Sequence, residues 1–166
     1  MSTVSLVFGE TDEVFEPDVD PPEALVTTWC RLEMLAPAHN DRDHAAWMSS
    51  IEHIHATPGF GSVDRHDSEW PMPMTSDQNL TDLEQHEREF LTREAFAYSV
   101  LDGDDVIGCV YIDPDDSSAT DATVRCWVRA SRADRDMDLA AAIDQWLRDT
   151  WPAHSRRWPG RPTLGS

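Results

Sequence analysis

The stretch AFAYSVLDGDDVIGCVYIDPDDSSATDATVRCWVRASRADRDMDLAAAIDQWLRDTWP, from Ala95 to Pro152, decides the fold of this chain. It contains three short runs rich in β-branched and aromatic residues, which favour strands. The middle run is almost wholly apolar, which indicates a central strand that is buried on both faces. Asp102-Gly103 favours a hairpin turn between the first two runs, and Asp113–Asp121 is expected to be a polar loop. The predicted strands are Phe96–Leu101, Val106–Ile112 and Ala122–Arg129.

A predicted helix, Met137–Thr150, closes this stretch. Its apolar residues recur at the spacing of a packed helical stripe, namely Leu139, Ile143, Trp146, Leu147 and Thr150. The polar turn Ala130–Asp136 joins the last strand to the helix, and Trp151-Pro152 ends the helix. Three strands that lead into one amphipathic helix form a core for the rest of the chain to cover.

Upstream segments predict one further strand and two further helices. Ala24–Leu35 has the composition of a strand. Asp41–His55 is expected to be a helix, and its buried stripe is Trp47, Met48, Ile51 and Ile54. Thr81–Glu94 is expected to be a second helix, because its first residue and Glu84 have the spacing of a capping box. The long stretch Thr57–Leu80 between them is either a lid over a site or an ordinary connection whose aromatic residues close the core.

The two ends of the chain carry less pattern. Residues 1–23 are predicted to be an acidic N-terminal arm, and residues 24–166 a single domain. A short strand is expected at Thr3–Phe8, which could replace a missing edge of the sheet. The tail Ala153–Ser166 supplies at most one brief edge strand. Because the N-terminus lacks the pattern of a secretory signal, we expect a cytoplasmic protein.

Charge limits the partners of this chain. Among 166 residues the net charge is -19, and all 13 basic side chains are arginines. Such a charge repels nucleic acid and anionic membranes, so neither is an expected partner. It either attracts a cationic acceptor or is a general property of an acidic surface.

Cysteines and histidines give no metal pattern. Cys30, Cys109 and Cys126 all fall in predicted strands, without a CxxC spacing, so we expect buried thiols. His53 and His55 are two residues apart and point away from each other on a helix. We therefore expect no metal, and solvent-facing histidines in the region of the first helix, including His39 and His44.

The order strand, helix, helix, three antiparallel strands, helix resembles the GNAT superfamily of acyl-CoA-dependent N-acetyltransferases. The runs VIGCVYIDP and TVRCWVR, followed by a turn into a helix, look like the third and fourth strands of that fold and its cofactor-binding helix. The resemblance covers about Ala24 to Pro152. It implies an α+β fold with a mixed, mainly antiparallel sheet, a single layer of sheet with helices on both faces.

The resemblance also implies acetyl-CoA as the cofactor. In that family the fourth strand separates from its neighbour and pairs with the pantetheine arm, which here implies the backbone of Cys126 to Arg129. The turn after the strand then presents backbone N–H groups to the pyrophosphate at the helix start. The implied cofactor-binding residues are Trp127, Val128, Arg129, Arg132, Arg135 and Met137.

The turn departs from the family pattern. The family has small residues where this chain has Arg135 and Met137, and no glycine lies between Gly108 and Gly160. Asp134, Asp136 and Asp138 place negative charge where a pyrophosphate would bind, although the interleaved arginines could offset it. Alternatively, Asp136 or Asp138 caps the helix and the arginines pair with the acids at the surface.

Catalytic residues are less defined than the cofactor site. The family's later helix, which often carries a tyrosine acid, has no counterpart in the short tail. The positional candidates for proton transfer are Glu33, His86, Tyr111 and Asp113.

Two hypotheses follow. The first is an acetyl-CoA-dependent N-acetyltransferase acting on an amine-bearing small molecule or peptide. The second is a catalytically inactive GNAT-like module that binds a partner protein or another ligand. In the second case, an exposed tail with Trp151 and Trp158, beside an open sheet edge, predicts a homodimer.

Overall fold

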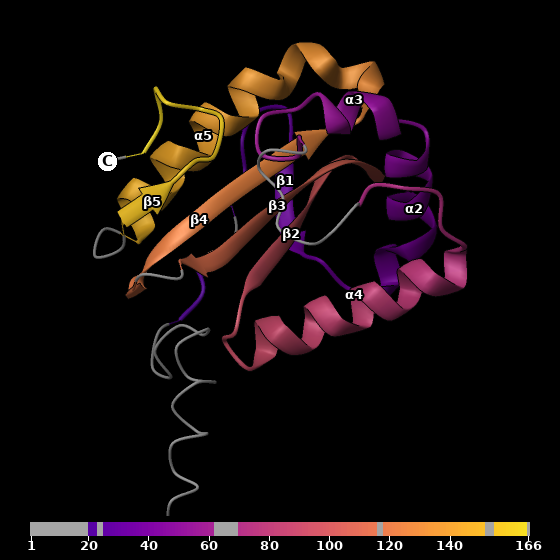
Figure 1. Cartoon of the computed structure of the whole chain (residues 1–166), viewed down its shortest axis with the longest axis horizontal. Helices are drawn as coiled ribbons and strands as arrows, with labels where there is room; N and C mark the ends of the chain where they lie inside the picture. Colours follow the sequence, from indigo (N-terminus) through magenta and orange to yellow (C-terminus); the bar gives the residue numbers. More distant parts are fainter. Residues whose placement is uncertain (1–19, 23–24, 62–69, 116–117, 152–154, 166) are drawn as a thin grey trace, which may run out of the picture.

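The molecule is organised around one sheet of five strands in the order β1-β2-β3-β4-β5 (Figure 1). A computed structural model describes residues 20–22, 25–61, 70–115, 118–151 and 155–165. The first four strands are antiparallel neighbours, and β5 runs parallel to β4. The strands are β1 (Arg31–Met34), β2 (Phe96–Asp102), β3 (Asp105–Asp115), β4 (Ser118–Val128) and β5 (Ser155–Arg157). The expected mixed, mainly antiparallel sheet is confirmed.

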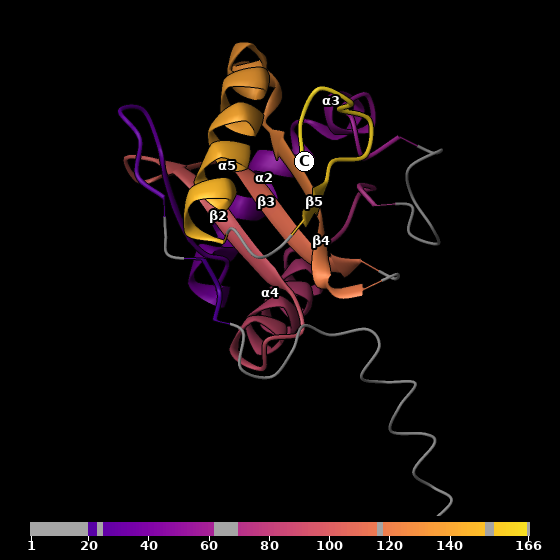
Figure 2. The same ribbon diagram turned by 90° about the vertical axis from the view of Figure 1, so that its left-hand side faces the viewer.

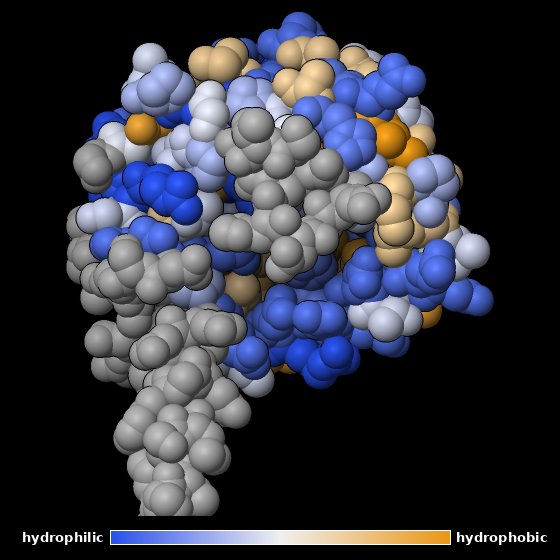
Figure 3. Space-filling model, viewed as in Figure 1, coloured by the Kyte–Doolittle hydropathy of each residue, from blue (hydrophilic) through white to orange (hydrophobic). Residues whose placement is uncertain are grey.

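Helices cover both faces of the sheet, as predicted (Figures 1 and 2). One face is covered by α5 (Asp136–Thr150). The apolar side chains between α5 and the sheet form one cluster, which we call the α5 cluster. On the other face lie α2 (Asn40–Met48), α3 (Ile51–His55) and α4 (Ser76–Leu91), which enclose a second cluster. β2, β3 and β4 therefore contribute side chains to both cores. The outer surface of α4 is hydrophilic, which fits its charged sequence (Figure 3).

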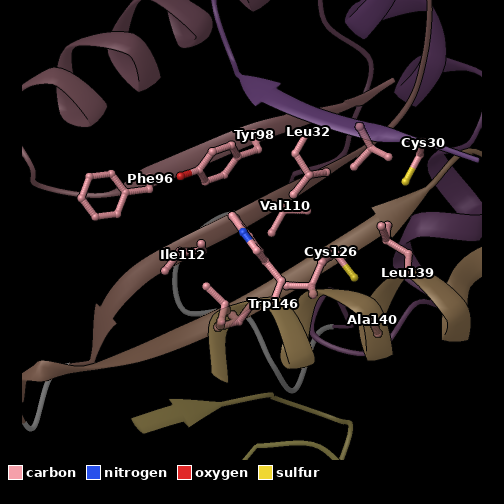
Figure 4. Close-up of a cluster of buried hydrophobic side chains, with 14 of the residues drawn as sticks. Cys30, Leu32, Phe96, Tyr98, Val110, Ile112, Cys126, Leu139, Ala140 and Trp146 are labelled. Atoms are coloured by element: carbon pink, nitrogen blue, oxygen red, sulfur yellow. The ribbon is translucent and has the colours of Figure 1, made fainter. Parts of the chain in front are cut away.

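The α5 cluster contains most of the predicted stripe. Leu139, Ile143 and Leu147 are buried against side chains of β2, β3 and β4 (Figure 4). Each such side chain contributes about 1.5–3 kcal/mol to stability. Thr150 was predicted in this stripe and is exposed; its hydroxyl donates to the carbonyl of Trp146 at 2.7 Å.

The hairpin between β2 and β3 is confirmed. Gly103 has a φ of 63°, which glycine adopts without the penalty that a side chain brings. β3 is buried on both faces over Val106–Val110, as expected of a central strand. Its pairing with β2 shifts register near Leu101, and a Cβ at Gly108 would lie 2.2 Å from the carbonyl oxygen of Trp127. Only glycine fits at this close approach of β3 and β4.

The predicted strand Ala24–Leu35 is wrong in its first half. Only Arg31–Met34 is a strand, and Val26 pairs back onto Arg31 across a tight turn. The hydroxyl of Thr27 accepts the N–H groups of Trp29 and Cys30 at 3.2 and 3.0 Å. This local side-chain bonding competes with an extended strand. Cys30 therefore lies outside β1, although all three cysteines are buried as expected.

The predicted helix Asp41–His55 is two helices. α2 ends at Met48 and α3 begins at Ile51, because Ser50 has a non-helical φ of −134°. The Ser49 hydroxyl donates to the carbonyl of Ala46 at 2.9 Å, and the Ser50 hydroxyl accepts the N–H of Ala130 at 2.8 Å. The break thus ties this segment to the far end of β4.

Two other boundaries differ from the prediction. α4 begins at Ser76, five positions before Thr81, and its capping box is formed by Thr75 and Gln78. The expected polar loop Asp113–Asp121 is mostly strand, since β3 continues to Asp115 and β4 begins at Ser118. Polar side chains at the outer end of a hairpin do not prevent backbone pairing.

The tail contributes one brief edge strand, β5, as predicted. The expectation of an exposed tryptophan-rich tail is wrong: Trp151 and Trp158 are 7% and 5% exposed and belong to the α5 cluster. Their burial removes one of the two features that predicted a homodimer.

Asp20 and Pro22 contact the core. Asp20 pairs with Arg93 at 2.7 Å, and the carbonyl of Pro22 accepts the hydroxyl of Tyr98 at 2.7 Å. The predicted strand Thr3–Phe8 lies outside the described residues, and the division at residues 23 and 24 stays a prediction. No helix among the described residues is long and apolar enough to cross a bilayer.

Candidate functional site

β4 has a strand partner along only part of its outer edge. The parallel pairing with β5 runs from Asp121 to Thr123, and no described strand pairs with this edge beyond Thr123. The N–H of Arg129 donates to Ile107 of β3 at 2.8 Å. Because backbone groups alternate in direction along a strand, those of Val124, Cys126 and Val128 point away from β3. We call these three residues the open edge of β4. Their backbone donors and acceptors lie on the β5 side of the strand, beyond the last residue that pairs with β5.

The junction after β4 is wound rather than open. The predicted polar turn Ala130–Asp136 is a 3-10 helix, Ala130–Arg135, that continues into α5. Its N–H groups are used internally: Arg132 donates to the carbonyl of Arg129 at 2.8 Å, and Asp136 donates to the carbonyl of Ala133. With Ala130 bonded to Ser50, a phosphate-binding row of backbone N–H groups does not form here.

Arginines and acids are interleaved at this junction and pair with each other. Arg132 contacts Asp102 at 2.9 Å, and Arg135 contacts Asp138 at 3.5 Å. Only the second contact is the pairing within the turn that the sequence left open as an alternative, because Asp102 lies at the end of β2. The capping role expected for Asp136 or Asp138 is wrong, because the N-cap residue is Arg135 and makes no side-chain capping bond. Both acids instead lie in the first turn of α5, where the helix dipole favours negative charge.

Asp136 is held by the tail. Both terminal nitrogens of Arg161 donate to its carboxylate, at 2.9 Å each, and the side chains of Arg161 and Asp136 are 3% and 17% exposed. The thiol of Cys126 lies beside this guanidinium group; burial raises its pKa to about 12. The start of α5 therefore carries a buried ion pair next to the open edge.

The tail also meets the loop after α3. A Cβ at Gly160 would lie 3.0 Å from the Cβ of Pro58, and a Cβ at Gly59 would lie 3.1 Å from the Cγ of Arg125. The φ angle is +76° at Gly160 and +93° at Gly59. Glycine at both positions lets the tail, this loop and β4 approach closely.

The residues implied for cofactor binding fall into two groups. Trp127 and Val128 are fully buried, and the indole N–H of Trp127 donates to the hydroxyl of Tyr111 at 3.1 Å. Arg129 is half-buried, and Met137 is 58% exposed. Because the backbone groups of Trp127 and Arg129 point toward β3, Val128 alone among these four residues offers backbone groups at the open edge.

Three of the four candidates for proton transfer lie close together on the α4 side of the sheet. The ring of His86 lies 5.8 Å from that of Tyr111, and Asp113 contacts Arg125 at 3.4 Å. The guanidinium of Arg125 lies over the Tyr111 ring at 5.7 Å. Burial raises the pKa of Tyr111 well above its ordinary value, so this hydroxyl is protonated at neutral pH.

Glu33 does not join this group. It lies on β1, separated from β4 by two strands, and contacts Arg31 at 2.8 Å and His39 at 3.4 Å. The hydrogen bond from Arg31 lowers the pKa of Glu33. His39 was expected to face solvent, but it is buried, bonds Ser99 at 2.9 Å and has a pKa lowered by burial.

Aromatic side chains from the ends of Thr57–Leu80 pack beside these residues. Trp70 lies 5.5 Å from Trp47 and 6.2 Å from Trp127, and Phe60 lies 6.1 Å from Tyr111. The nitrogens of His44 and His55 bond the carbonyls of Met74 and Pro71, each at 2.7 Å. Both alternatives for this stretch, lid and connection, include such packing, and the lid stays a prediction.

Sequence reasoning missed Arg161 and Asp43. Arg161 belongs to a tail read only as short and basic, and its partner is 25 positions earlier. Asp43 lies at the start of the predicted helix Asp41–His55, and it is buried and accepts the amide of Asn79 at 3.0 Å. The signal for Asp43 was its place one turn before the buried Trp47 on the same helix face.

Comparisons with known proteins agree with this architecture. No family model and no curated protein matches the sequence. Among solved structures, an acetyltransferase that modifies the N-terminal serine of ribosomal protein L7/L12 from Salmonella typhimurium is 9% identical, with a TM-score of 0.59 over 80% of this chain and 72% of that one. A protein described as a GnaT-family acetyltransferase from Bordetella pertussis is 16% identical, with a TM-score of 0.57 over 81% and 76%.

A third structure is in complex with a cofactor. The microcin C7 self-immunity acetyltransferase, solved with acetyl-CoA and AMP, is 11% identical, with a TM-score of 0.60 over 78% of this chain and 69% of that one. These similarities define the class: the chain has the fold of the GNAT N-acetyltransferases.

Proposed function

We propose that this chain is an acetyl-CoA-dependent N-acetyltransferase acting on an amine of a small molecule or peptide. The observation that carries the proposal is the open edge of β4, which begins where the pairing with β5 ends. Backbone groups of Val124, Cys126 and Val128 fit an arm that carries amides, because they offer alternating donors and acceptors. When bound, acetyl-CoA supplies a thioester whose carbonyl carbon the amine attacks while the thiol leaves.

Residues on the α4 side of the sheet would move the proton. Tyr111 bonds to Trp127 of β4, and its raised pKa keeps the hydroxyl protonated, so it suits a hydrogen-bond donor to the departing sulfur rather than a strong acid. His86 and Asp113 are partly exposed and suit a base or acceptor contact. Acetyltransferases of ribosomal-protein N-termini are among the structures with this fold, which makes a peptide amine a reasonable first acceptor to test.

Calorimetric titration with acetyl-CoA tests the proposal. We expect saturable binding and a rise in melting temperature; at a hundredfold excess over Kd the folded state gains about 2.7 kcal/mol. Release of free thiol with a panel of amines and peptides then measures turnover. The absence of any binding at millimolar acetyl-CoA would refute the proposal.

One observation favours the second candidate, an inactive GNAT-fold module. The α5 start, where a pyrophosphate would bind, carries Asp136 and lacks a glycine-rich cradle. Saturable binding without thiol release from any amine would support this module, whereas turnover would exclude it. A homodimer remains part of this candidate, and sedimentation or gel filtration measures it directly.

A further inference from the structure

We infer that Arg161 binds the phosphate groups of coenzyme A, and that Asp136 holds this side chain ready until the ligand displaces it. The inference rests on the proposed function, because it assigns a residue of the same site. It explains how this chain could bind a diphosphate although its junction lacks glycines and uses its N–H groups internally.

The geometry of the ion pair is that of a phosphate contact. Arg161 presents two parallel N–H donors to two oxygens of Asp136, at 2.9 Å each. A guanidinium group makes the same two-pronged contact with phosphate oxygens. Asp136 is the first residue of α5, and its two carboxylate oxygens contact the guanidinium as two phosphate oxygens would. The carboxylate therefore takes the place that an external anion would occupy.

The two partners differ in freedom. Arg161 is fixed at its base, since its N–H donates to Trp158 at 3.1 Å and its carbonyl accepts from Leu164 at 3.1 Å. Its Nε is buried without a hydrogen-bond partner among the described residues. Asp136 is the more exposed of the pair, so its carboxylate can turn to solvent while the guanidinium stays in place.

Arg132 and Arg135 lie nearer the surface than Arg161 and contact other acids, Asp102 and Asp138. Arg161 also adjoins Cys126, a residue of the open edge, so one ligand could contact both.

Calorimetric titration of four variants with coenzyme A, and with pantetheine as a probe that lacks the diphosphate, tests the inference. We expect Arg161→Gln to weaken coenzyme A binding at least about tenfold and Asp136→Asn to strengthen it about tenfold. Arg157→Gln and Asp138→Asn make the same charge changes at nearby exposed positions and should change Kd less than about threefold. Pantetheine affinity should stay constant across all four variants.

Several outcomes would overturn the inference. If Arg161→Gln binds coenzyme A as well as or better than the wild type, Arg161 only attaches the tail to α5 and the inference is wrong. If circular dichroism shows that Arg161→Gln does not fold, Arg161→Lys replaces it, because lysine keeps the charge but lacks the two parallel N–H donors. An unchanged ratio of coenzyme A to pantetheine affinity in this variant would contradict the inference. If wild type and all variants bind neither probe, the proposed function itself fails; if the wild type binds and Arg161 is irrelevant, only this inference fails.

Discussion

At the scale of single residues, Asp43 is the most consequential buried acid. It lies between α2 and α4, where Asn79 donates to it at 3.0 Å and also accepts the indole N–H of Trp47 at 3.1 Å. Burial raises the pKa of Asp43 to about 6, and the bond from Asn79 only partly offsets this. The protonated form is therefore favoured by folding.

Asp43→Asn should stabilise the protein near neutral pH. A carboxyl with a raised folded pKa costs stability as pH rises from about 4 to about 6, and the full cost, at most about 3 kcal/mol, is present above pH 6. Asparagine keeps an acceptor for Asn79 and carries no charge. Thermal melts at pH 7.5 should show a higher melting temperature for the variant, and the gain should vanish near pH 4.

Asp41→Asn is the matched control for this change. Asp41 is exposed in the first turn of the same helix, so its loss of charge should slightly destabilise α2 at neutral pH. An equal gain from both variants would mean that relief of net charge, and not burial, determines the effect.

At the scale of elements, α4 illustrates how a cap fixes a boundary. The hydroxyl of Thr75 accepts the N–H of Gln78 at 3.1 Å, and the Gln78 side chain accepts the N–H of Thr75 at 2.9 Å. Thr81 and Glu84 have the same spacing in the sequence, but Thr81 lies inside the helix and donates to Asp77 at 3.3 Å. Spacing alone did not distinguish the two boxes.

Thr75→Ala should destabilise the protein by about 1 kcal/mol, because it leaves an N–H at the start of α4 without its side-chain partner. Thr81→Ala, at an exposed position within the helix, should change stability by less than about 0.5 kcal/mol or increase it slightly. Urea unfolding of both variants measures the difference. A larger loss from Thr81→Ala would show that the helix begins where the sequence first indicated.

Element types were predictable where apolar periodicity was strong. The three strands and α5 of Ala95–Pro152 follow from it, and so does the central position of β3. The errors lie where a single polar side chain outweighs the pattern: Thr27 turns the chain before β1, and Ser50 breaks the helix between α2 and α3. The Ser50 hydroxyl accepts from Ala130, which lies far away in the sequence, whereas the bonds of Thr27 are local but do not show in the pattern of apolar residues.

At the scale of the whole molecule, Asp144 joins α5 to the tail. It accepts from Arg148 at 2.6 Å, from Trp158 at 2.9 Å and from Arg156 at 3.0 Å. Burial would raise the pKa of Asp144, but the bonds from Arg156 and Trp158 outweigh burial and lower it. Sequence analysis placed Asp144 on the helix without a role, because its partners lie in the tail.

Asp144→Asn should destabilise the protein by about 3 kcal/mol at pH 7, since it removes the carboxylate to which the buried guanidinium of Arg156 donates. Because the folded pKa is lowered, this stabilisation is present above the ordinary pKa of about 4 and is lost as pH falls through the folded value. Urea unfolding should show the stabilities of wild type and variant converging as pH falls below about 4.

Arg148→Gln provides the control, because Arg148 is the half-exposed partner of Asp144, and its removal should cost less than about 1 kcal/mol. Equal losses from both variants at pH 7 would contradict a special role for the buried pair.

The order of elements allowed the fold to be predicted, whereas the site was only partly predictable. The resemblance to the GNAT pattern predicted the fourth strand. The open edge lies along this strand, beyond its pairing with β5. The contacts at the junction after β4 could not be predicted, because the absence of glycines does not indicate which side chains pair there. Arg161 reaches Asp136 only when the tail folds back past β5, and no periodicity encodes that contact.

The strand order of the sheet is also the order of the strands in the chain. β2, β3 and β4 follow one another closely in the chain, and the β2–β3 hairpin closes over a loop of only Gly103 and Asp104. Such local closure is fast, on the order of microseconds. The β1–β2 and β4–β5 pairs must wait for the helices that lie between their strands in the chain. The β4–β5 pairing covers only three positions at the border where a ligand would enter, so its backbone amides are expected to be among the first to exchange their protons with solvent.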